Sequence, residues 1–125
     1  IQAVQLQLEQ VFLNVALNAI QQMALPSAYG KQLDIISKYD PTDKEYPIKI
    51  YFTDEGPGIH RKYWDWIFNM GTSTREDGIG LGLFGSKRLL ELMGGKISVK
   101  SSYIFVGSTF LIQLPDLSKE EVLNA

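Results

Sequence analysis

Nine of the eleven glycines lie within one stretch of forty residues, between Gly56 and Gly95. Glycine weakens the interior of helices and strands, and it favours turns and places where the backbone must approach a ligand or another segment closely. Regular hydrophobic patterns occur before this stretch, and they return in its second half and in the residues that follow it. The clustering of these glycines is therefore the feature that the fold and the function have to explain.

The first half predicts one long helix followed by two strands. Apolar residues recur at helical spacing over residues 4–24, with no Gly or Pro among them. Residues 33–39 and 48–53 are rich in strand-forming side chains, and the Asp-Pro-Thr-Asp sequence at 40–43 is typical of a turn. We expect these strands to pair with each other.

The second half predicts the same order of elements. Residues 60–68 suit a short, aromatic-rich helix, and residues 69–80 form a polar segment without a regular pattern. Residues 81–93 predict a second helix, because Gly-Gly follows directly in the manner of a helix C-cap. Residues 96–100 and 109–114 alternate apolar and polar side chains and predict two more strands.

This order of elements predicts an α+β fold. We expect a two-layer α/β sandwich whose mixed, mostly antiparallel sheet is covered on one face by about three helices. The length of 125 residues favours one domain, which we place at residues 1–116, followed by a C-terminal tail at 117–125.

Composition excludes several kinds of function. The chain has no cysteine and one histidine, so thiol catalysis, disulfides, and Cys-based or His-rich metal sites are excluded. A net charge of −2 gives no electrostatic reason to expect nucleic acid or a membrane surface as a partner of this domain. No segment has the apolar length of a membrane span, which favours a cytoplasmic domain, although the parent protein could be membrane-anchored elsewhere.

The predicted first helix carries an unusual polar stripe. Gln7, Gln10, Asn14, Asn18 and Gln21 are spaced three or four residues apart, so they share one helix face. Asparagine is a poor residue for a helix interior, and a buried amide without a partner costs about 1–3 kcal/mol. The stripe is either a solvated face or a face that meets a ligand or ion.

Two glycine motifs follow the first half. Asp54-Glu55-Gly56-Pro57-Gly58-Ile59 places a carboxylate at a strand end, where it can accept a hydrogen bond from a ligand while glycine lets the backbone pass close to a flat ring. An ordinary turn explains this segment equally well. Gly78-Ile79-Gly80-Leu81-Gly82-Leu83 leads into a helix start, where free N–H groups favour phosphate. A flexible hinge is the alternative, whereas the Rossmann and P-loop patterns do not fit.

Taken together and in this order, the motifs resemble the ATP-binding domain of sensor histidine kinases, within the Bergerat-fold superfamily shared with type II topoisomerase, chaperone and mismatch-repair ATPases. The resemblance covers residues 4–115. The matching segments are 10–19 (N box), 54–59 (G1 box), 66–68 with 72–75 (F box and lid), 78–83 (G2 box), and 91–97 with 107–110 at the end.

The resemblance implies ATP and Mg²⁺ as cofactors, with a lid over residues 69–79. Asn14 and Asn18 would be the catalytic residues and the Mg²⁺ ligands, and Asp54 would accept a hydrogen bond from the adenine amine. The other implied nucleotide contacts are Gly56, Gly58, Ile59, Phe68, Thr72, Ser73, Thr74, Arg75, Gly78, Gly80, Leu81, Gly82 and Leu83. Gln21-Gln22 stand where many members have Lys-Tyr, so a basic phosphate contact is lost there.

One position separates phosphoryl transfer from hydrolysis. The ATPases of this superfamily have a Glu four residues before the second Asn, where it activates water, and this chain has Asn14 there. A histidine acceptor needs no strong base, because its neutral imidazole is already a nucleophile. The resemblance therefore implies a protein-histidine kinase whose acceptor lies on a dimerisation domain of the same parent protein, with a response regulator downstream. An ATP-hydrolysing switch and a non-catalytic nucleotide-binding scaffold remain the alternatives.

Overall fold

The computed structural model describes residues 2–70 and 82–116. Within them the chain forms two α-helices, two short 3₁₀ helices and four strands. Their bounds are α1 (Gln2–Met23), β1 (Asp34–Tyr39), β2 (Ile48–Asp54), η1 (Arg61–Tyr63), η2 (Trp66–Phe68), α2 (Gly82–Leu92), β3 (Lys96–Tyr103) and β4 (Gly107–Leu114).

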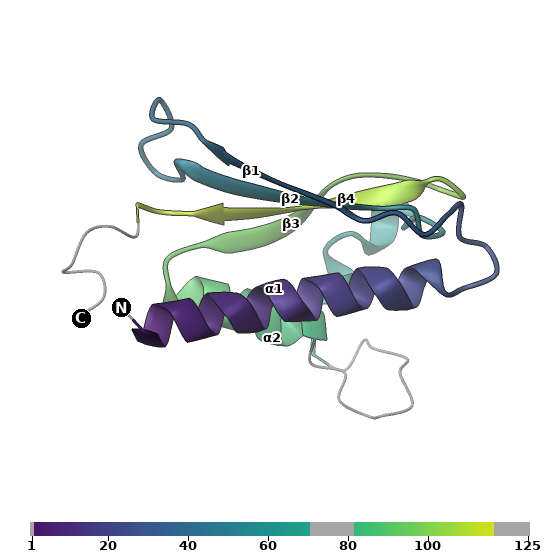
Figure 1. Ribbon diagram of the computed structural model, residues 1–125, viewed down its shortest axis with the longest axis horizontal. Coiled ribbons are helices and arrows are strands. Elements are labelled where there is room, and N and C mark those ends of the chain that lie inside the picture. The colour runs from purple at the N-terminus through teal and green to yellow at the C-terminus, as the bar shows by residue number, and fades with distance from the viewer. Residues whose placement is uncertain (1, 71–81, 117–125) are drawn as a thin grey trace.

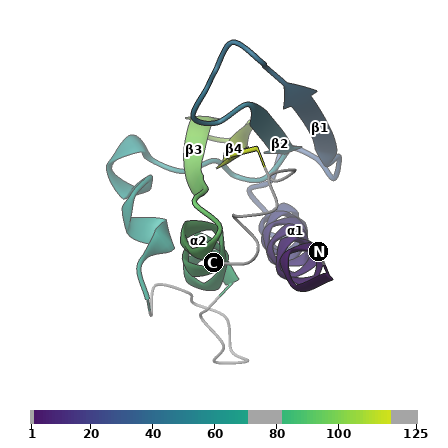
Figure 2. The same cartoon turned by 90° about the vertical axis from the view of Figure 1, so that its left-hand side faces the viewer.

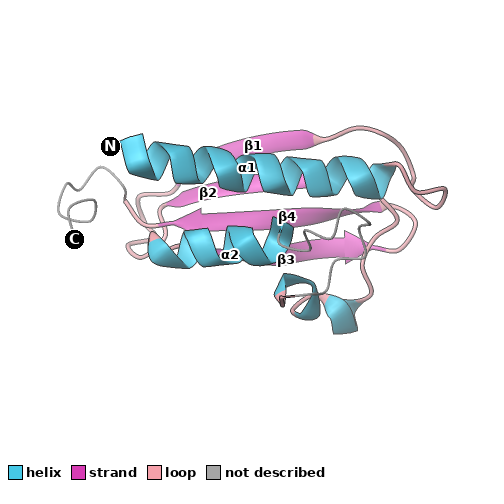
Figure 3. Cartoon of the chain, turned by 90° about the horizontal axis from the view of Figure 1, so that it is seen from below, coloured by secondary structure: helices cyan, strands magenta, loops and turns pink. Residues whose placement is uncertain are grey.

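The four described strands form one sheet in the order β1-β2-β4-β3, and each neighbouring pair is antiparallel. Both α-helices lie on the same face of this sheet, so the domain has two layers (Figure 1; Figure 2). Seen from the helical side, α1 and α2 lie side by side and run roughly along the direction of the strands (Figure 3). The predicted α+β sandwich is confirmed, with an antiparallel sheet.

The core lies between the helices and the inner face of the sheet. Every second residue of β2 and β4 points inward, as strand geometry requires, and α1 contributes residues at helical spacing. The side chains with less than 2% of their surface exposed are Phe52, Phe110, Leu90, Ile112, Leu114, Val11, Val15 and Ser86.

Two predicted elements differ from those observed. Residues 60–68 form two short 3₁₀ helices in place of one α-helix. A nine-residue segment rich in aromatic side chains gains too little from helix propagation to offset its nucleation cost. The hairpin of β3 and β4 is longer than the pattern predicted, because Ser101, Ser102 and Tyr103 pair with residues 107–109 after a shift in register.

Candidate functional site

A pocket opens where α1, the end of β2, the start of β4 and the start of α2 approach one another. It contains about 380 Å³ of space, part of which is open solvent. The residues that line it are Asn18, Gln22, Asp54, Pro57, Gly58, Ile59, Ile67, Leu83, Ser108 and Phe110. The pocket thus contains residues from the polar helix stripe and from the segment that follows β2. Leu83, the last residue of the glycine motif at 78–83, lines it as well.

Asp54 is the buried acid of this pocket. It is the last residue of β2, its exposed fraction is 4%, and Gly56 N–H donates to its Oδ1 at 2.8 Å. Burial raises the pKa of the Asp54 carboxyl, and hydrogen bonds from the backbone of Gly56 and Ser108 oppose that rise. A buried carboxylate held by backbone donors is an acceptor of fixed position that can receive an N–H group from a ligand.

Glycine is required at two positions around Asp54. Gly58 has a φ of +83°, and a Cβ there would collide with the backbone of the β3–β4 hairpin, coming within 2.8 Å of Ile104 Cα. Gly107 has a φ of +150°, and a Cβ there would collide with the carbonyl oxygen of Asp54. These close approaches hold the loop after β2 against the hairpin, which fixes the floor of the pocket.

The walls of the pocket are largely apolar. Ile59, Ile67, Leu83 and Phe110 supply aliphatic and aromatic surface. Behind the wall, the Phe68 ring meets Phe110 edge to face, with ring centroids 6.1 Å apart, and Phe68 itself lies in the core. Apolar walls around one buried acceptor suit a flat heteroaromatic ring that carries an N–H donor.

The polar stripe of α1 reaches the pocket only at its C-terminal part. Asn18 and Gln22 line the pocket. One turn earlier, the Asn14 side-chain oxygen accepts a hydrogen bond from Gln10 at 2.9 Å, and Asn14 is not among the lining residues. The stripe is therefore hydrogen-bonded within itself on the outer part of the helix at Asn14, and it lines the pocket at Asn18.

The pocket gathers five of the expected nucleotide-binding residues, namely Asn18, Asp54, Gly58, Ile59 and Leu83. Gly56 acts on the pocket through its hydrogen bond to Asp54, Phe68 supports the wall from the core, and Gly82 is the first residue of α2. The expected contacts at Thr72, Ser73, Thr74, Arg75, Gly78, Gly80 and Leu81 lie outside the described residues, as does nearly all of the expected lid.

Five of the lining residues are not among the contacts expected from the sequence: Gln22, Pro57, Ile67, Ser108 and Phe110. A signal existed for two of them. Gln22 follows Asn18 by one helical turn, and Ser108 is the register partner of Asp54 on β4. The second signal requires the strand order, which the sequence pattern does not contain.

Two other features are absent from the described part of the chain. It holds no group of three or more His, Cys, Asp or Glu side chains arranged to hold a metal ion. No helix in the described ranges is long and apolar enough to cross a bilayer.

The sheet, its single helical layer and a buried Asp beside a helix Asn define an α+β domain of the ATP-binding sandwich class. The family of histidine kinase-, DNA gyrase B- and HSP90-like ATPases matches residues 3–118. The chain therefore belongs to this family.

Named relatives are sensor kinases. The chain is 37% identical over 116 residues to sensor histidine kinase ZraS of Salmonella typhimurium, covering 91% of this chain and 23% of that protein. It is 36% identical over 109 residues to sporulation kinase A of Bacillus subtilis, covering 87% of this chain and 16% of that protein. The chain thus spans less than a quarter of either relative.

Solved structures show the same fold. Full-length ShkA in complex with AMPPNP is 28% identical with a TM-score of 0.72, and the alignment covers 87% of this chain and 21% of that one. The catalytic domain of histidine kinase ThkA is 26% identical with a TM-score of 0.65, covering 87% of this chain and 66% of that one.

Proposed function

We propose that this domain binds Mg²⁺-ATP and donates the γ-phosphoryl group to a histidine on a separate dimerisation domain of the same parent protein. The observation that carries the proposal is the meeting of Asp54 and Asn18 in one pocket, although they lie on different elements. Relatives named as sensor histidine kinases, and a structural neighbour in complex with AMPPNP, support the same function.

Asp54 selects adenine in this proposal. Its carboxylate accepts a hydrogen bond from the exocyclic amine of the ring, while the apolar walls contact the ring faces. Guanine carries a carbonyl oxygen at the equivalent position, and two acceptors facing each other in a buried site repel. The buried position of Asp54 makes this discrimination stronger than it would be in water.

Asn18 is the Mg²⁺ ligand in this proposal. An amide oxygen is a hard ligand, and Mg²⁺ is commonly held by one or two protein groups together with phosphate oxygens. When bound, the ion neutralises charge on the phosphates during transfer. Asn14 lies one turn away, where its oxygen accepts a hydrogen bond from Gln10, and it contributes less directly in this proposal.

Transfer is favoured over hydrolysis because no described glutamate is placed to activate water in the pocket. Glu9 is exposed and accepts a hydrogen bond from Gln5, and Glu55 accepts one from the backbone of Gln32 outside the pocket. Without a base, water is a poor nucleophile, whereas a neutral imidazole attacks the γ-phosphorus directly. The new N–P bond forms as the bond to the β–γ bridging oxygen breaks, ADP leaves, and the imidazole proton is lost to solvent.

The acceptor histidine belongs to another domain. His60 is the one histidine of the chain, and its ring nitrogen accepts a hydrogen bond from Lys62 N–H at the start of η1. We assign it this local capping role. The domain at residues 1–116 then works in the cytoplasm with its parent's histidine domain and, through it, with a response regulator.

Incubation of the chain with the parent's histidine domain and γ-labelled ATP tests this function. We expect label on the histidine domain, and loss of that label in Asp54→Asn but not in Asp40→Asn, which changes a half-buried aspartate in the β1–β2 turn, outside the pocket. Steady release of free phosphate by the chain alone would favour the ATP-hydrolysing switch. Nucleotide binding without transfer to the histidine domain would favour the scaffold.

A further inference from the structure

The hairpin that joins β3 to β4 ends in four exposed hydrophobic residues, Tyr103, Ile104, Phe105 and Val106, which we call the apolar tip. Their exposed fractions are 66%, 48%, 66% and 51%. Single exposed apolar residues are common on protein surfaces, but a contiguous group of large ones marks an interaction site. None of these side chains is needed for the core, so their presence at the tip requires another explanation.

The backbone of the apolar tip is strained. Phe105 has a φ of +66°, which is the left-handed region that bulky side chains rarely adopt. The conformation is held by a hydrogen bond of 2.7 Å from Phe105 N–H to the carbonyl of Pro57, and by one of 3.0 Å from Val106 N–H to Tyr103. Glycine or asparagine would be relaxed at this position, so the chain retains a phenyl ring there at a cost in stability.

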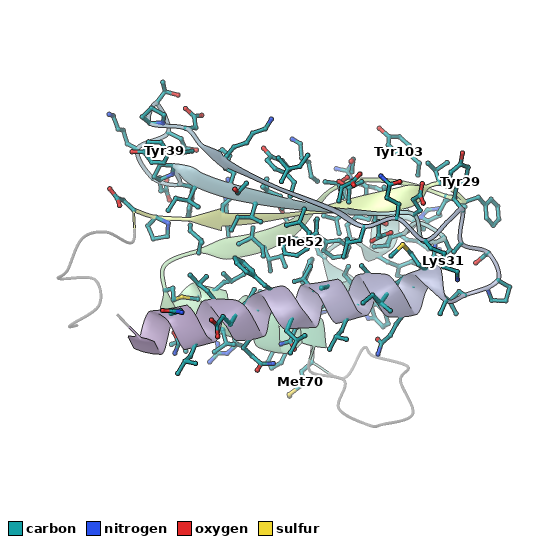
Figure 4. All side chains as sticks on the ribbon, viewed as in Figure 1. Tyr29, Lys31, Tyr39, Phe52, Met70 and Tyr103 are labelled. Carbon is teal, nitrogen blue, oxygen red and sulfur yellow. The ribbon has the colours of Figure 1, made fainter. Side chains whose placement is uncertain are left out.

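A groove adjoins the apolar tip on the face of the sheet that the helices leave uncovered. It contains about 640 Å³ of space, part of it open solvent, and its lining includes Tyr29, Tyr103, Val106, Asp34 and Glu55. Tyr29 and Tyr103 lie at the same end of the molecule, opposite to Tyr39 (Figure 4). Asp54 and Ser108, which line the pocket under the helices, also line this groove. Aromatic and aliphatic surface is thus placed beside the more exposed carboxylates of Asp34 and Glu55.

The groove keeps its negative charge. Asp34 accepts hydrogen bonds from the side-chain amide of Gln32 at 3.1 and 3.2 Å, and Glu55 accepts one from the Gln32 backbone at 2.9 Å. These donors are neutral. Lys31 is close in sequence, but its ammonium group donates to the carbonyl of Met23 at the end of α1, at 2.7 Å.

We propose that the apolar tip and this groove bind a basic, apolar segment of a partner protein. A lysine or arginine of that segment would lie between the tyrosine rings and the carboxylates, where cation–π contact and opposite charge act together. Flanking apolar residues would cover Ile104, Phe105 and Val106. The carboxylates select this occupant over a lipid surface, because a membrane with anionic headgroups would be repelled by them.

The surface is connected to the nucleotide pocket through the loop after β2. Asp54 and Ser108 line both the groove and the pocket. Phe105 N–H donates to Pro57, and Ile59 N–H donates to Ser102 Oγ at 2.7 Å. The proposal does not depend on the proposed kinase function, since the apolar tip and groove are defined without the nucleotide.

The test uses the chain and two fluorescein-labelled peptides of about twelve residues. One alternates Arg with Leu, and the other alternates Glu with Leu. Fluorescence anisotropy should show binding of the basic peptide with a dissociation constant of roughly 10–100 μM and no binding of the acidic one. Tyr103→Ser, and the double change Asp34→Asn with Glu55→Gln, should each weaken binding at least about tenfold.

Tyr39→Ser is the matched control, because Tyr39 is 67% exposed on the far end of β1 and should leave binding unchanged. Thermal unfolding of each variant checks that it is folded. The proposal is overturned if the basic peptide does not bind, if both peptides bind equally, or if the two tyrosine variants lose binding equally. A dimer in sedimentation velocity, or association with phosphatidylcholine vesicles, that depends on Tyr103 would also overturn it.

Discussion

Asp54 and Glu55 are adjacent in the chain, but only Asp54 lines the pocket under the helices, whereas both residues line the groove beside the hairpin. Asp54 points toward the helices, is 4% exposed and accepts hydrogen bonds from backbone N–H groups. Glu55 is only half-buried, lines the groove beside the hairpin and accepts from Gln32. Because successive side chains of an extended backbone alternate between faces, the last residue of β2 and the residue after it direct their carboxylates to different hydrogen-bond partners.

The two carboxylates differ in what their surroundings allow. Burial raises the pKa of Asp54 and fixes its position, so a partner gains most by satisfying it with a well-placed donor. Glu55 can exchange a water contact for a partner contact at small cost, which is typical of a surface used for reversible docking. The same side-chain chemistry thus supports ligand selection in one place and partner attraction in the other.

The largest expected difference between changing Asp54 and changing Glu55 is in the affinity for nucleotide. Asp54→Asn should weaken ADP binding at least about thirtyfold, because the amide turns an N–H donor toward the adenine amine and leaves buried groups unsatisfied, at about 2–3 kcal/mol. Glu55→Gln should change the affinity by less than about twofold, as expected for a half-exposed group outside the pocket. Isothermal titration calorimetry with ADP and Mg²⁺ measures both.

Circular dichroism and thermal unfolding of the two variants provide the control for folding. Equal loss of affinity in both variants would contradict the separation of the two recesses. Loss in Glu55→Gln alone would reverse the assignment of the adenine contact.

The different surroundings of these two carboxylates follow largely from the sequence, because the strand predicted at residues 48–53 has alternating side chains, and the observed strand continues this alternation to Asp54. The buried position of Asp54 and the helical polar stripe were therefore predictable. The inner face of the sheet and the core of α1 follow from the same periodicities.

The groove and the apolar tip were not predictable in this way. They depend on β4 pairing with both β2 and β3, and on a register shift near Val99 that lengthens the hairpin to Tyr103. Likewise, the helical stripe did not distinguish Asn14 from Asn18. That distinction arises because the end of β2 approaches α1 only near its C-terminal part, where Asn18 and Gln22 lie.

A second prediction sharpens the role of the pocket by comparing these two asparagines. Asn18→Ala should reduce the affinity for ADP in the presence of Mg²⁺ about tenfold, or roughly 1.4 kcal/mol, because a hard ligand for the ion is lost. Asn14→Ala should cost less than about threefold, since its oxygen is engaged with Gln10 and it does not line the pocket.

The measurement is calorimetry with and without Mg²⁺. The effect of Asn18→Ala should shrink when the ion is removed, whereas a general packing defect would persist. A larger loss in Asn14→Ala than in Asn18→Ala would show that the pocket of the free protein does not represent the bound site.

A third prediction concerns pH and separates the buried Asp54 from its half-buried neighbour Glu55. The folded protein holds the proton of Asp54 more tightly than the unfolded chain, because its pKa is raised by burial. The free energy of unfolding should therefore fall as pH rises from about 4 through the raised pKa, and then level off. Each tenfold difference in proton affinity between the folded and unfolded chain corresponds to a fall of about 1.4 kcal/mol.

Urea unfolding across this pH range, with Asp54→Asn as the reference, isolates the contribution of Asp54 to the free energy of unfolding. The decline should be present in the native sequence and in Glu55→Gln, and absent in Asp54→Asn. An unchanged difference between native protein and Asp54→Asn at all pH values would mean that Asp54 titrates normally.

The smallest effect is expected at the apolar tip, and its sign is informative. Phe105→Asn should raise the free energy of unfolding by about 0.5–1 kcal/mol, because asparagine tolerates the left-handed backbone that Phe105 adopts, while an exposed phenyl ring contributes little packing. The same change should weaken the basic peptide's binding, since the ring belongs to the proposed docking surface.

Tyr39→Ser, at an exposed strand position with ordinary backbone geometry, should give no such gain in stability. Urea unfolding and peptide anisotropy on one set of variants measure both quantities. Stability and binding moving in opposite directions indicate that the strain is retained for docking, whereas a loss of both would make Phe105 a structural residue of the hairpin.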